Sequence, residues 1–188
     1  MTVVRIAACT ALLLLAAGCA NTNVSVRSLT RSQLDDPARG VIVVSTGAAA
    51  RCAMTAMWAP IYDAKTHQLA PGRPVVPVDE PSASDYVDHF GTLSALSLAP
   101  GRYVIALEYA NPEFDSNTVP AFAFEVVAGQ TAYLGELYRE TPCGMRASVE
   151  KRDSFDRDMA LALRLNPALA GRQPTKTLMV TVRHPVNP

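Results

Sequence analysis

Two neighbouring stretches decide the fold, 97-SLAPGRYVIALEY-109 and 122-FAFEVVAGQTAYLGELY-138. Apolar and polar side chains alternate along both, which is typical of strands that bury one face. Between the strands expected at 93–98 and 102–109, Pro100 and Gly101 predict a type II turn. Proline fixes φ at the second turn position, and glycine accepts the positive φ of the third. We therefore expect these two strands to form a hairpin.

Short apolar runs bounded by turn residues predict further strands on both sides of this centre. They lie at 41–44, 52–62, 133–139, 145–149 and 177–183, and Pro60 indicates an edge position or a bulge in the second of them. The Pro-containing segments 63–89 and 111–120 are expected to be loops, the first with a short extended piece around Val75 and Val76. Long ordered loops are often functional, so both are candidate contact surfaces.

One helix is predicted near 154–166. Asp153 or Ser154 can cap its start, and Asp156 and Asp158 suit the positive end of the helix dipole. Pro167 ends the helix, because the residue before a proline is pushed out of the α conformation. The apolar stripe expected to face the core consists of Phe155, Met159, Ala162 and Leu163, with Leu161 and Leu165 beside it. The expected fold class is mainly β: a seven- to eight-stranded antiparallel β-sandwich with one helix in the C-terminal half.

Composition limits the kind of partner. The 188 residues are 49% hydrophobic, and 17 Lys and Arg balance 17 Asp and Glu. This length normally corresponds to one domain. A formal net charge of zero argues against a nucleic-acid-binding protein, which would show a basic excess.

The first residues, MTVVRIAACTALLLLAAGC, are organised as a signal peptide. The apolar run at 6–17 follows Arg5 and is shorter than the roughly 20 residues that a spanning helix needs. The ending 16-AAGC-19 resembles the bacterial lipobox, in which the cysteine is acylated and becomes the first mature residue. The resemblance implies a lipid on Cys19, and Ala20, in place of a retention-favouring Asp, implies the outer membrane. Ordinary cleavage that leaves a soluble periplasmic protein is the alternative.

This interpretation divides the chain into a lipoprotein signal peptide at 1–18, a lipidated tether at 19–39 and a β-sandwich domain at 40–188. The tether is polar and rich in Ser, Thr and Asn, although Val24 and Val26 leave a short strand as an alternative. Cys52 and Cys143 remain in the mature chain, and an even remainder of two suggests one disulfide in an oxidising compartment. Two buried thiols are the alternative, and neither cysteine has the Cys-x-x-Cys spacing of a redox or zinc site.

The two stretches quoted first have a Pro-Gly turn before one Tyr-containing strand and an Ala-Gly turn before the next. In this they resemble the prealbumin-like, or transthyretin-like, β-sandwich modules of bacterial envelope proteins. The helical segment 157-RDMALAL-163, with Asn166 and Pro167 after it, is similar to uncharacterised Gram-negative bacterial lipoproteins. These motifs consist of turn residues, so the resemblance implies a fold and says little about activity.

The sequence contains no nucleophile elbow, Walker loop, dinucleotide fingerprint or His-Glu-x-x-His motif, so no catalytic residue, cofactor or metal ligand is assigned. The three histidines, His67, His89 and His184, are expected to be scattered. The 63–89 loop and its border are a candidate divalent-cation site, with a solvated acidic loop as the alternative. Its acidic residues are Asp79, Glu80, Asp85 and Asp88. The basic residues Lys151, Arg152, Arg157 and Arg164 are expected to form the solvated side of the helix region.

The sequence thus predicts a non-enzymatic envelope lipoprotein that acts as an interaction or structural module in the periplasm. Lipid on Cys19 would hold it to the membrane, its expected partner is an envelope protein, and no nucleic acid is expected. The alternative is a periplasmic lipoprotein that binds a small ligand or a divalent cation. A hydrolase whose site is assembled from distant residues is the third class of function.

Overall fold

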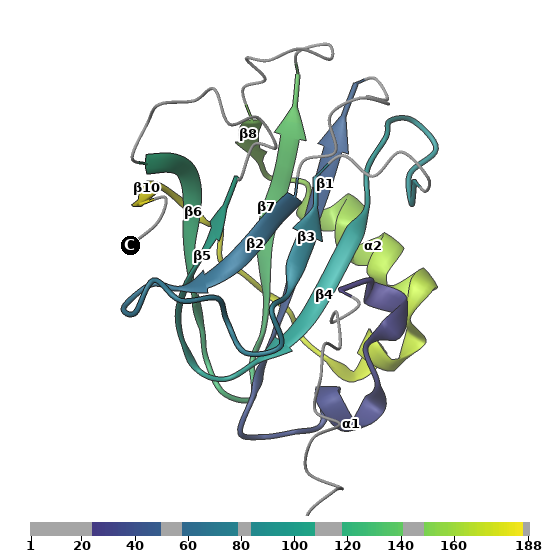
Figure 1. The fold of residues 1–188 in the computed structure, drawn as a ribbon. Helices are drawn as coiled ribbons and strands as arrows, with labels where there is room; N and C mark the ends of the chain where they lie inside the picture. The colour runs from purple at the N-terminus through teal and green to yellow at the C-terminus, as the bar shows by residue number, and fades with distance from the viewer. Residues whose placement is uncertain (1–23, 50–57, 79–83, 108–117, 141–148, 186–188) are drawn as a thin grey trace, which may run out of the picture.

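The structure, a computed structural model, describes residues 24–49, 58–78, 84–107, 118–140 and 149–185. These residues form two β-sheets and one main helix, α2 (Figure 1). The helical elements are η1 (Val26–Ser28), α1 (Arg31–Leu34), α2 (Phe155–Leu165) and η2 (Pro167–Gly171). The strands are β1 (Gly40–Ala48), β2 (Trp58–Asp63), β3 (Val75–Pro77), β4 (Leu93–Leu98), β5 (Gly101–Ala106), β6 (Thr118–Val126), β7 (Thr131–Arg139), β8 (Val149–Arg152), β9 (Thr175–Lys176) and β10 (Val180–Pro185).

The first sheet has the order β4-β1-β7, with β8 and β9 both paired to the far edge of β7. The second has the order β10-β6-β5-β2-β3. Most neighbouring strands are antiparallel, but β1 and β7 run parallel, as do β7 and β9. All nine residues of β1 are buried. This burial explains why β1 has a continuous apolar run at its start instead of an alternating pattern.

The turns after β4 and β6 carry the chain from one sheet to the other. β4 pairs with β1, whereas β5 pairs with β2 and β6, so the predicted hairpin at 93–109 is wrong. The type II turn is also wrong, because Gly101 is not among the glycines with positive φ. A Pro-Gly turn shows only that the chain reverses, and tertiary packing decides whether the next strand pairs or crosses.

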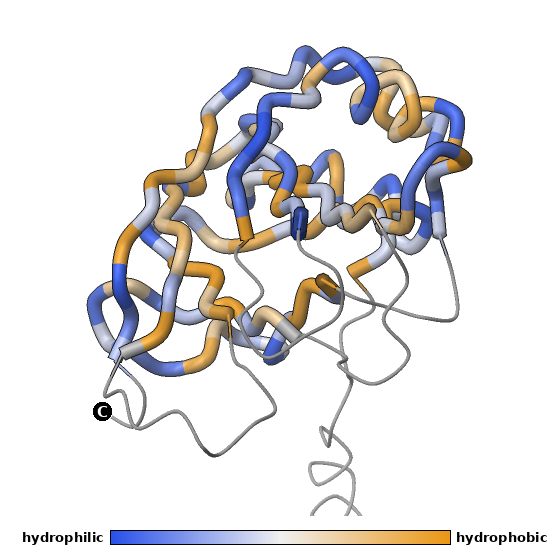
Figure 2. The backbone as a smooth tube through the Cα atoms, turned by 90° about the horizontal axis from the view of Figure 1, so that it is seen from above, coloured by the Kyte–Doolittle hydropathy of each residue, from blue (hydrophilic) through white to orange (hydrophobic). Residues whose placement is uncertain are grey.

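The two sheets enclose a shared apolar core. It combines Ile42 and Leu96 of the first sheet with Ile61, Ile105 and Phe122 of the second. Figure 2 shows the backbone from above, coloured by hydropathy, with hydrophobic stretches in orange and hydrophilic stretches in blue. A second core packs the other face of the first sheet against α2 and the N-terminal helices.

The prediction of a mainly β fold with one main helix is confirmed. The predicted strand number is too low, since the described residues alone contain ten strands, and not every pairing is antiparallel. The additional strands are short: β3 has three residues and β9 has two. Such strands are too short to show a period in the sequence. Pro60 lies inside β2 where the strand changes partner, from β3 at Trp58–Pro60 to β5 at Ile61–Asp63.

The described part of the predicted tether, residues 24–39, packs on the domain. Val26, Leu29 and Leu34 are buried in the second core. Asn166 donates from Nδ2 to the carbonyls of Val26 (2.9 Å) and Leu29 (2.8 Å), which joins this segment to the end of α2. Residues 24–39 are therefore part of the folded domain, which begins earlier in the chain than residue 40.

The helix α2 begins and ends close to the predicted positions and buries most of the predicted apolar stripe, with Phe155 and Leu165 packed against the second core. Leu163 is exposed, and the buried positions are Asp158, Met159, Leu161 and Ala162. Ser154 is the N-cap residue, yet its side chain makes no capping bond. Its hydroxyl instead donates to Glu136 Oε2 on β7 at 2.9 Å. Both differences arise from a buried polar cluster beneath the helix.

Candidate interaction site

Asp158 is the centre of this polar cluster and is fully buried on the sheet-facing side of α2. Its Oδ2 accepts hydrogen bonds from Tyr133 OH at 2.7 Å and from the Ser45 hydroxyl. Its Oδ1 accepts from Tyr86 OH and from Arg157 Nε, each at 2.9 Å. A buried carboxylate is tolerated only when it is paired and hydrogen-bonded, and these donors satisfy that condition.

Glu136 on β7 is the second buried carboxylate, 1% exposed. Arg157 Nη2 forms ion pairs with Glu136 Oε1 and Asp158 Oδ1, both at 2.8 Å, so one guanidinium bridges the two acids. His89 Nε2 lies 3.3 Å from the same Glu136 oxygen, and His89 Nδ1 lies 2.8 Å from Asp88. The cluster thus continues from the inside of the domain to the exposed Asp88.

The cluster holds the loop at 84–92, hereafter the 84–92 loop, against α2 and β7. Tyr86 and His89 stack with ring centroids 4.3 Å apart, and the Arg157 guanidinium lies 4.6 Å from the centre of the Tyr86 ring. At the base of the loop, Asp85 forms an ion pair with Arg27 and accepts from the amide of Leu93 at 2.8 Å. The loop is therefore fixed at both ends and in its middle.

Two apolar side chains project from this fixed loop. Val87 is fully exposed and Phe90 is 40% exposed. Asp88, between them, has 68% of its side chain exposed. Single exposed apolar residues are ordinary, but apolar residues on a rigid loop are the kind of anchor that protein interfaces use. Figure 1 shows the loop, in teal, at the upper end of β4.

Close backbone approach at Gly47 makes room for the cluster. A Cβ at this position would lie 2.5 Å from Glu136 Oε1 and 2.7 Å from Tyr138 Cδ2. It would also lie 3.1 Å from His89 Cδ2. Glycine is needed here because no larger residue leaves space for the Glu136 carboxylate and the imidazole together.

The cluster shifts the pKa values of its members. Burial raises the pKa of Tyr86 and of Tyr133, and the charge of Asp158 raises both further. Burial alone lowers the pKa of Arg157, but the partners Glu136 and Asp158 outweigh it and hold that pKa above its ordinary value. The hydrogen bond from His89 lowers the pKa of Asp88.

These tyrosines predict alkaline sensitivity. Their folded-state pKa values lie above the unfolded ones, so stability is fully present below about pH 10 and falls as the unfolded chain ionises. Each such tyrosine contributes about 1.4 kcal/mol per pH unit to the decline. Denaturant titrations at increasing pH measure this slope. Tyr133→Phe should reduce it by about one tyrosine's share, and an unchanged slope would contradict the assignment.

The cluster does not form a nucleophile–base pair. Ser154 contacts Oε2 of Glu136 and His89 contacts Oε1, and among the described residues no hydrogen bond joins this hydroxyl to this imidazole. Ser45 is fully buried beneath Asp158. Within the described ranges, no three His, Cys, Asp or Glu side chains come together as metal ligands. The arrangement ties the 84–92 loop to α2 and β7.

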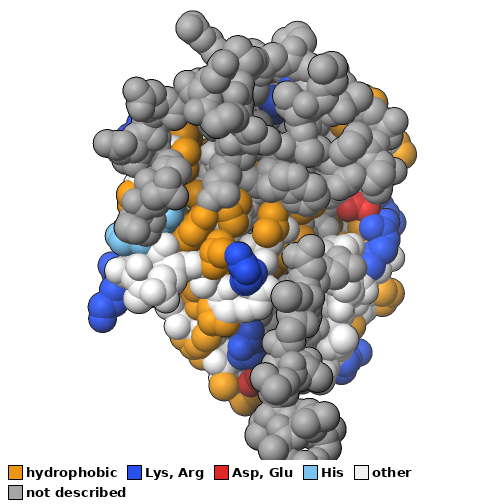
Figure 3. Space-filling model, in the orientation of Figure 1, with side chains coloured by type: hydrophobic (Ala, Val, Ile, Leu, Met, Phe, Trp, Pro, Cys, Tyr) orange, Lys and Arg blue, Asp and Glu red, His pale blue; other side chains and the backbone are white. Residues whose placement is uncertain are grey.

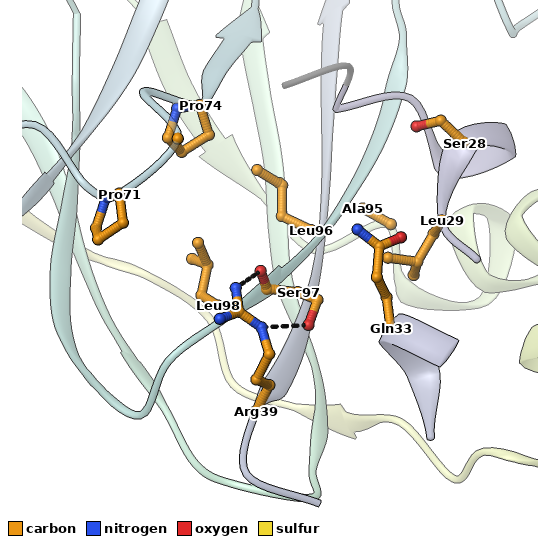
Figure 4. Close-up of a pocket in the computed structure, with 11 residues that line it drawn as sticks. Ser28, Leu29, Gln33, Arg39, Pro71, Pro74, Ala95, Leu96, Ser97 and Leu98 are labelled. Carbon is orange, nitrogen blue, oxygen red and sulfur yellow. Dashed lines mark hydrogen bonds between the residues drawn. The ribbon is translucent and has the colours of Figure 1, made fainter. Parts of the chain in front are cut away.

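A groove lies at the free edge of β4, away from the polar cluster (Figure 4). It has a volume of about 310 Å³. Residues 95–98 of β4 form its floor, Leu29 and Gln33 one wall, and Pro71 and Pro74 the other. Arg39 crosses its lower end, where Nε donates to the Ser97 hydroxyl at 3.0 Å and Nη2 donates to the Ser97 carbonyl. Figure 3 shows hydrophobic and basic side chains together on this face of the molecule.

The structure describes only some of the predicted site residues, and it places these against different partners. Cys19, Cys52 and Cys143 lie outside the described residues, as do Asp79 and Glu80. Within the acidic loop, Asp85 and Asp88 are directed to different partners, Arg27 and His89. The histidines are not all scattered, because the rings of His67 and His184 lie 5.4 Å apart, beside Tyr62.

Sequence reasoning missed the cluster itself. Asp158 was expected at the exposed start of a helix and Arg157 on its solvated side, but both are tied to Glu136 and the 84–92 loop. Lys151 is exposed, as expected, and also donates to the carbonyl of Met179 at 2.6 Å. The two acids in the first turn of α2 are explained equally well by the helix dipole, so they did not indicate the cluster.

Searches against models of known protein families and against curated proteins find no match to this chain. In the described part of the chain, no helix is both long enough and apolar enough to cross a membrane.

Proposed function

We propose that this protein is a lipid-anchored envelope module that presents the 84–92 loop to a protein partner. In this proposal the two sheets form a prealbumin-like β-sandwich, the lipid is attached to Cys19, and the domain faces the periplasm from the outer membrane. The module is not an enzyme. The lipobox at 16–19 and the signal-peptide pattern before it support the anchor and the compartment.

One observation carries the choice of surface: a network of buried charges holds a loop that exposes Val87 and Phe90. Burying Glu136 and Asp158 is costly compared with an apolar core of the same volume. Such a network is understandable if the position of the loop matters for binding, because a preordered loop loses less entropy when it binds. The expected partner has an apolar pocket for these side chains and a hydrogen-bond donor for Asp88.

A photo-crosslinking amino acid at Val87 tests the interaction in cells of the native host. We expect one discrete protein adduct from position 87 and none from position 180, where Val180 is 63% exposed on the other sheet. With the probe at Phe90, Val87→Asp should abolish the adduct. Equal adducts at positions 87 and 180, or none at 87, would overturn the proposed surface.

Intact mass of the chain extracted from its native membrane tests the anchor. We expect cleavage before Cys19, a mass increase from a diacylglyceryl or triacyl group, and a disulfide between Cys52 and Cys143 that resists alkylation until reduced. The variant Cys19→Ser should remain unprocessed and carry no lipid. A mature chain without lipid would contradict the proposed anchor. The proposed role of the loop would then be judged by the crosslinking experiment alone.

A further inference from the structure

Two histidines that are far apart in the sequence meet on one face of the second sheet. His67 lies in the turn after β2, and His184 lies in β10, the edge strand of that sheet (Figure 1). Their ring centroids are 5.4 Å apart, and the two planes are inclined by 51°. His184 is 4% exposed, and its ring centroid lies 4.4 Å from that of Tyr62. The pair is therefore a packed feature of the fold.

Small side chains make room for the two rings. Tyr62 and Val182 belong to a small apolar cluster on the face of the second sheet that is turned away from the shared core. His184 is two residues after Val182 in the same strand, so it points to the same face. Ala106 and Ala121 of this cluster are opposite each other in β5 and β6 and are completely buried. Methyl groups at these positions leave space in which side chains from β2 and β10 can meet.

The turn at 63–68 fixes the position of His67. The Asp63 carboxylate accepts from the amides of Lys65 at 2.9 Å and Thr66 at 2.8 Å. The Asp63 carbonyl accepts from the His67 amide at 2.9 Å. His67 itself has a φ of 58°, in the left-handed region that few residues other than glycine occupy. Backbone strain of this kind persists where the surroundings over-determine it, and it is concentrated at functional sites.

His67 also has a nitrogen available to a ligand. Among the described residues, its Nδ1 is buried and has no hydrogen-bond partner, although buried polar atoms are normally paired. A neutral imidazole nitrogen can offer its lone pair to a metal ion, and histidine is the commonest metal ligand. Two imidazoles bound to one tetrahedral ion at about 2.0–2.1 Å have ring centres roughly 5 Å apart, close to the observed separation.

We propose that His67 and His184 together bind a divalent transition-metal ion, with Nδ1 of His67 as one ligand and water completing the coordination. Imidazole nitrogens favour Zn²⁺, Cu²⁺ and Ni²⁺ over Mg²⁺ and Ca²⁺, which take oxygen ligands. Within the described ranges no third His, Cys, Asp or Glu joins the pair, so the site keeps open coordination positions and holds an exchangeable ion. The bound ion joins the turn after β2 to the edge strand β10. The site depends neither on the lipid anchor nor on the 84–92 loop.

Titration of the purified chain with Zn²⁺, after alkylation of any free thiols, tests this site. In His67→Asn we expect at least about tenfold weaker binding, because losing a ligand costs no less than losing a residue that only orients one. Asparagine accepts the positive φ at this position, so the turn is retained. Gln68→Ala is the matched control, since it removes an exposed side chain from the same turn and should leave the affinity unchanged. Equal affinity in the native chain and His67→Asn, or no binding of Zn²⁺, would overturn the proposal.

Electron paramagnetic resonance of the Cu²⁺-loaded chain identifies the ligands in a way that does not depend on stability. We expect hyperfine coupling to two imidazole nitrogens in the native chain, and to one in either His67→Asn or His184→Gln. An excess of Mg²⁺ should leave the native spectrum unchanged. The same coupling in all three chains would place the copper elsewhere and overturn the proposal. Neither measurement involves the lipid or the probe at Val87, so failure of the metal site and failure of the proposed function are separable.

Discussion

Asp158→Ala is expected to lower the free energy of unfolding by about 3–5 kcal/mol. The substitution leaves the hydroxyls of Ser45 and Tyr133 without their acceptor in a fully buried site. It also removes one of the two carboxylates that neutralise Arg157. Buried groups that lose their partners cost far more than the pair contributed, which is why the expected loss is large. Urea titration of the purified chain measures it.

The matched control is Asp156→Ala, two residues earlier on the exposed side of the same helix. It removes the same charge from the same helix turn. Its effect on the free energy of unfolding therefore reports only the helix-dipole and helix-propensity contributions, which amount to about 1 kcal/mol or less. In Asp158→Ala, hydrogen exchange should also quicken in the 84–92 loop, because Tyr86 loses its acceptor. Similar losses from the two variants would mean that the buried cluster contributes little.

Gly91→Ala is the second substitution with a large expected effect. A Cβ at this position would lie 2.0 Å from the Thr46 carbonyl oxygen and 3.0 Å from Gly47 Cα. Both are backbone atoms of the central strand β1, so relief requires movement of the loop end away from the sheet. The loop is paired there through hydrogen bonds between Phe90 and Ala48, at 2.6 and 3.1 Å. We expect a loss of about 3 kcal/mol, at the upper end of overpacking effects.

Gly171→Ala serves as the control for this substitution. Nothing lies within 4 Å of a Cβ at Gly171, which is at the end of η2. Replacement there should be neutral or stabilising by up to about 1 kcal/mol, because alanine restricts the unfolded chain. Thermal unfolding compares the two variants. If the two variants unfold at the same temperature, the close approach of the loop to β1 does not constrain the fold.

Local patterns predicted the individual elements well where the pattern was long. Residues 93–98 were predicted as a strand and form β4, and the helix predicted near 154–166 is α2. The start of the domain was missed, because Val26, Leu29 and Leu34 are too few and too separated to indicate burial in a polar segment. Their burial depends on contacts with α2 and η2, more than a hundred residues later in the chain.

The candidate site could not be read from the sequence for the same reason. Tyr86, Tyr133 and Asp158 come from a loop, a strand and a helix that only the folded chain brings together. An acid in the first turn of a helix is explained equally well by the helix dipole, so its burial has no local signature. The glycine at position 47 likewise looks like a turn residue, but it lies inside β1 against the Glu136 carboxylate.

The sequence by itself determined the alternation of the strands, the position of α2 and the points where the chain reverses. These properties depend on neighbouring residues, whose periodicity and turn chemistry act locally. Tertiary structure alone decided that the reversals after Leu98 and Val126 cross between sheets, and that β1 and β7 run parallel. It also decided that Asp158 is buried among hydroxyls. Each of these depends on the packing of segments distant in the chain, because burial and charge pairing are properties of the assembled core.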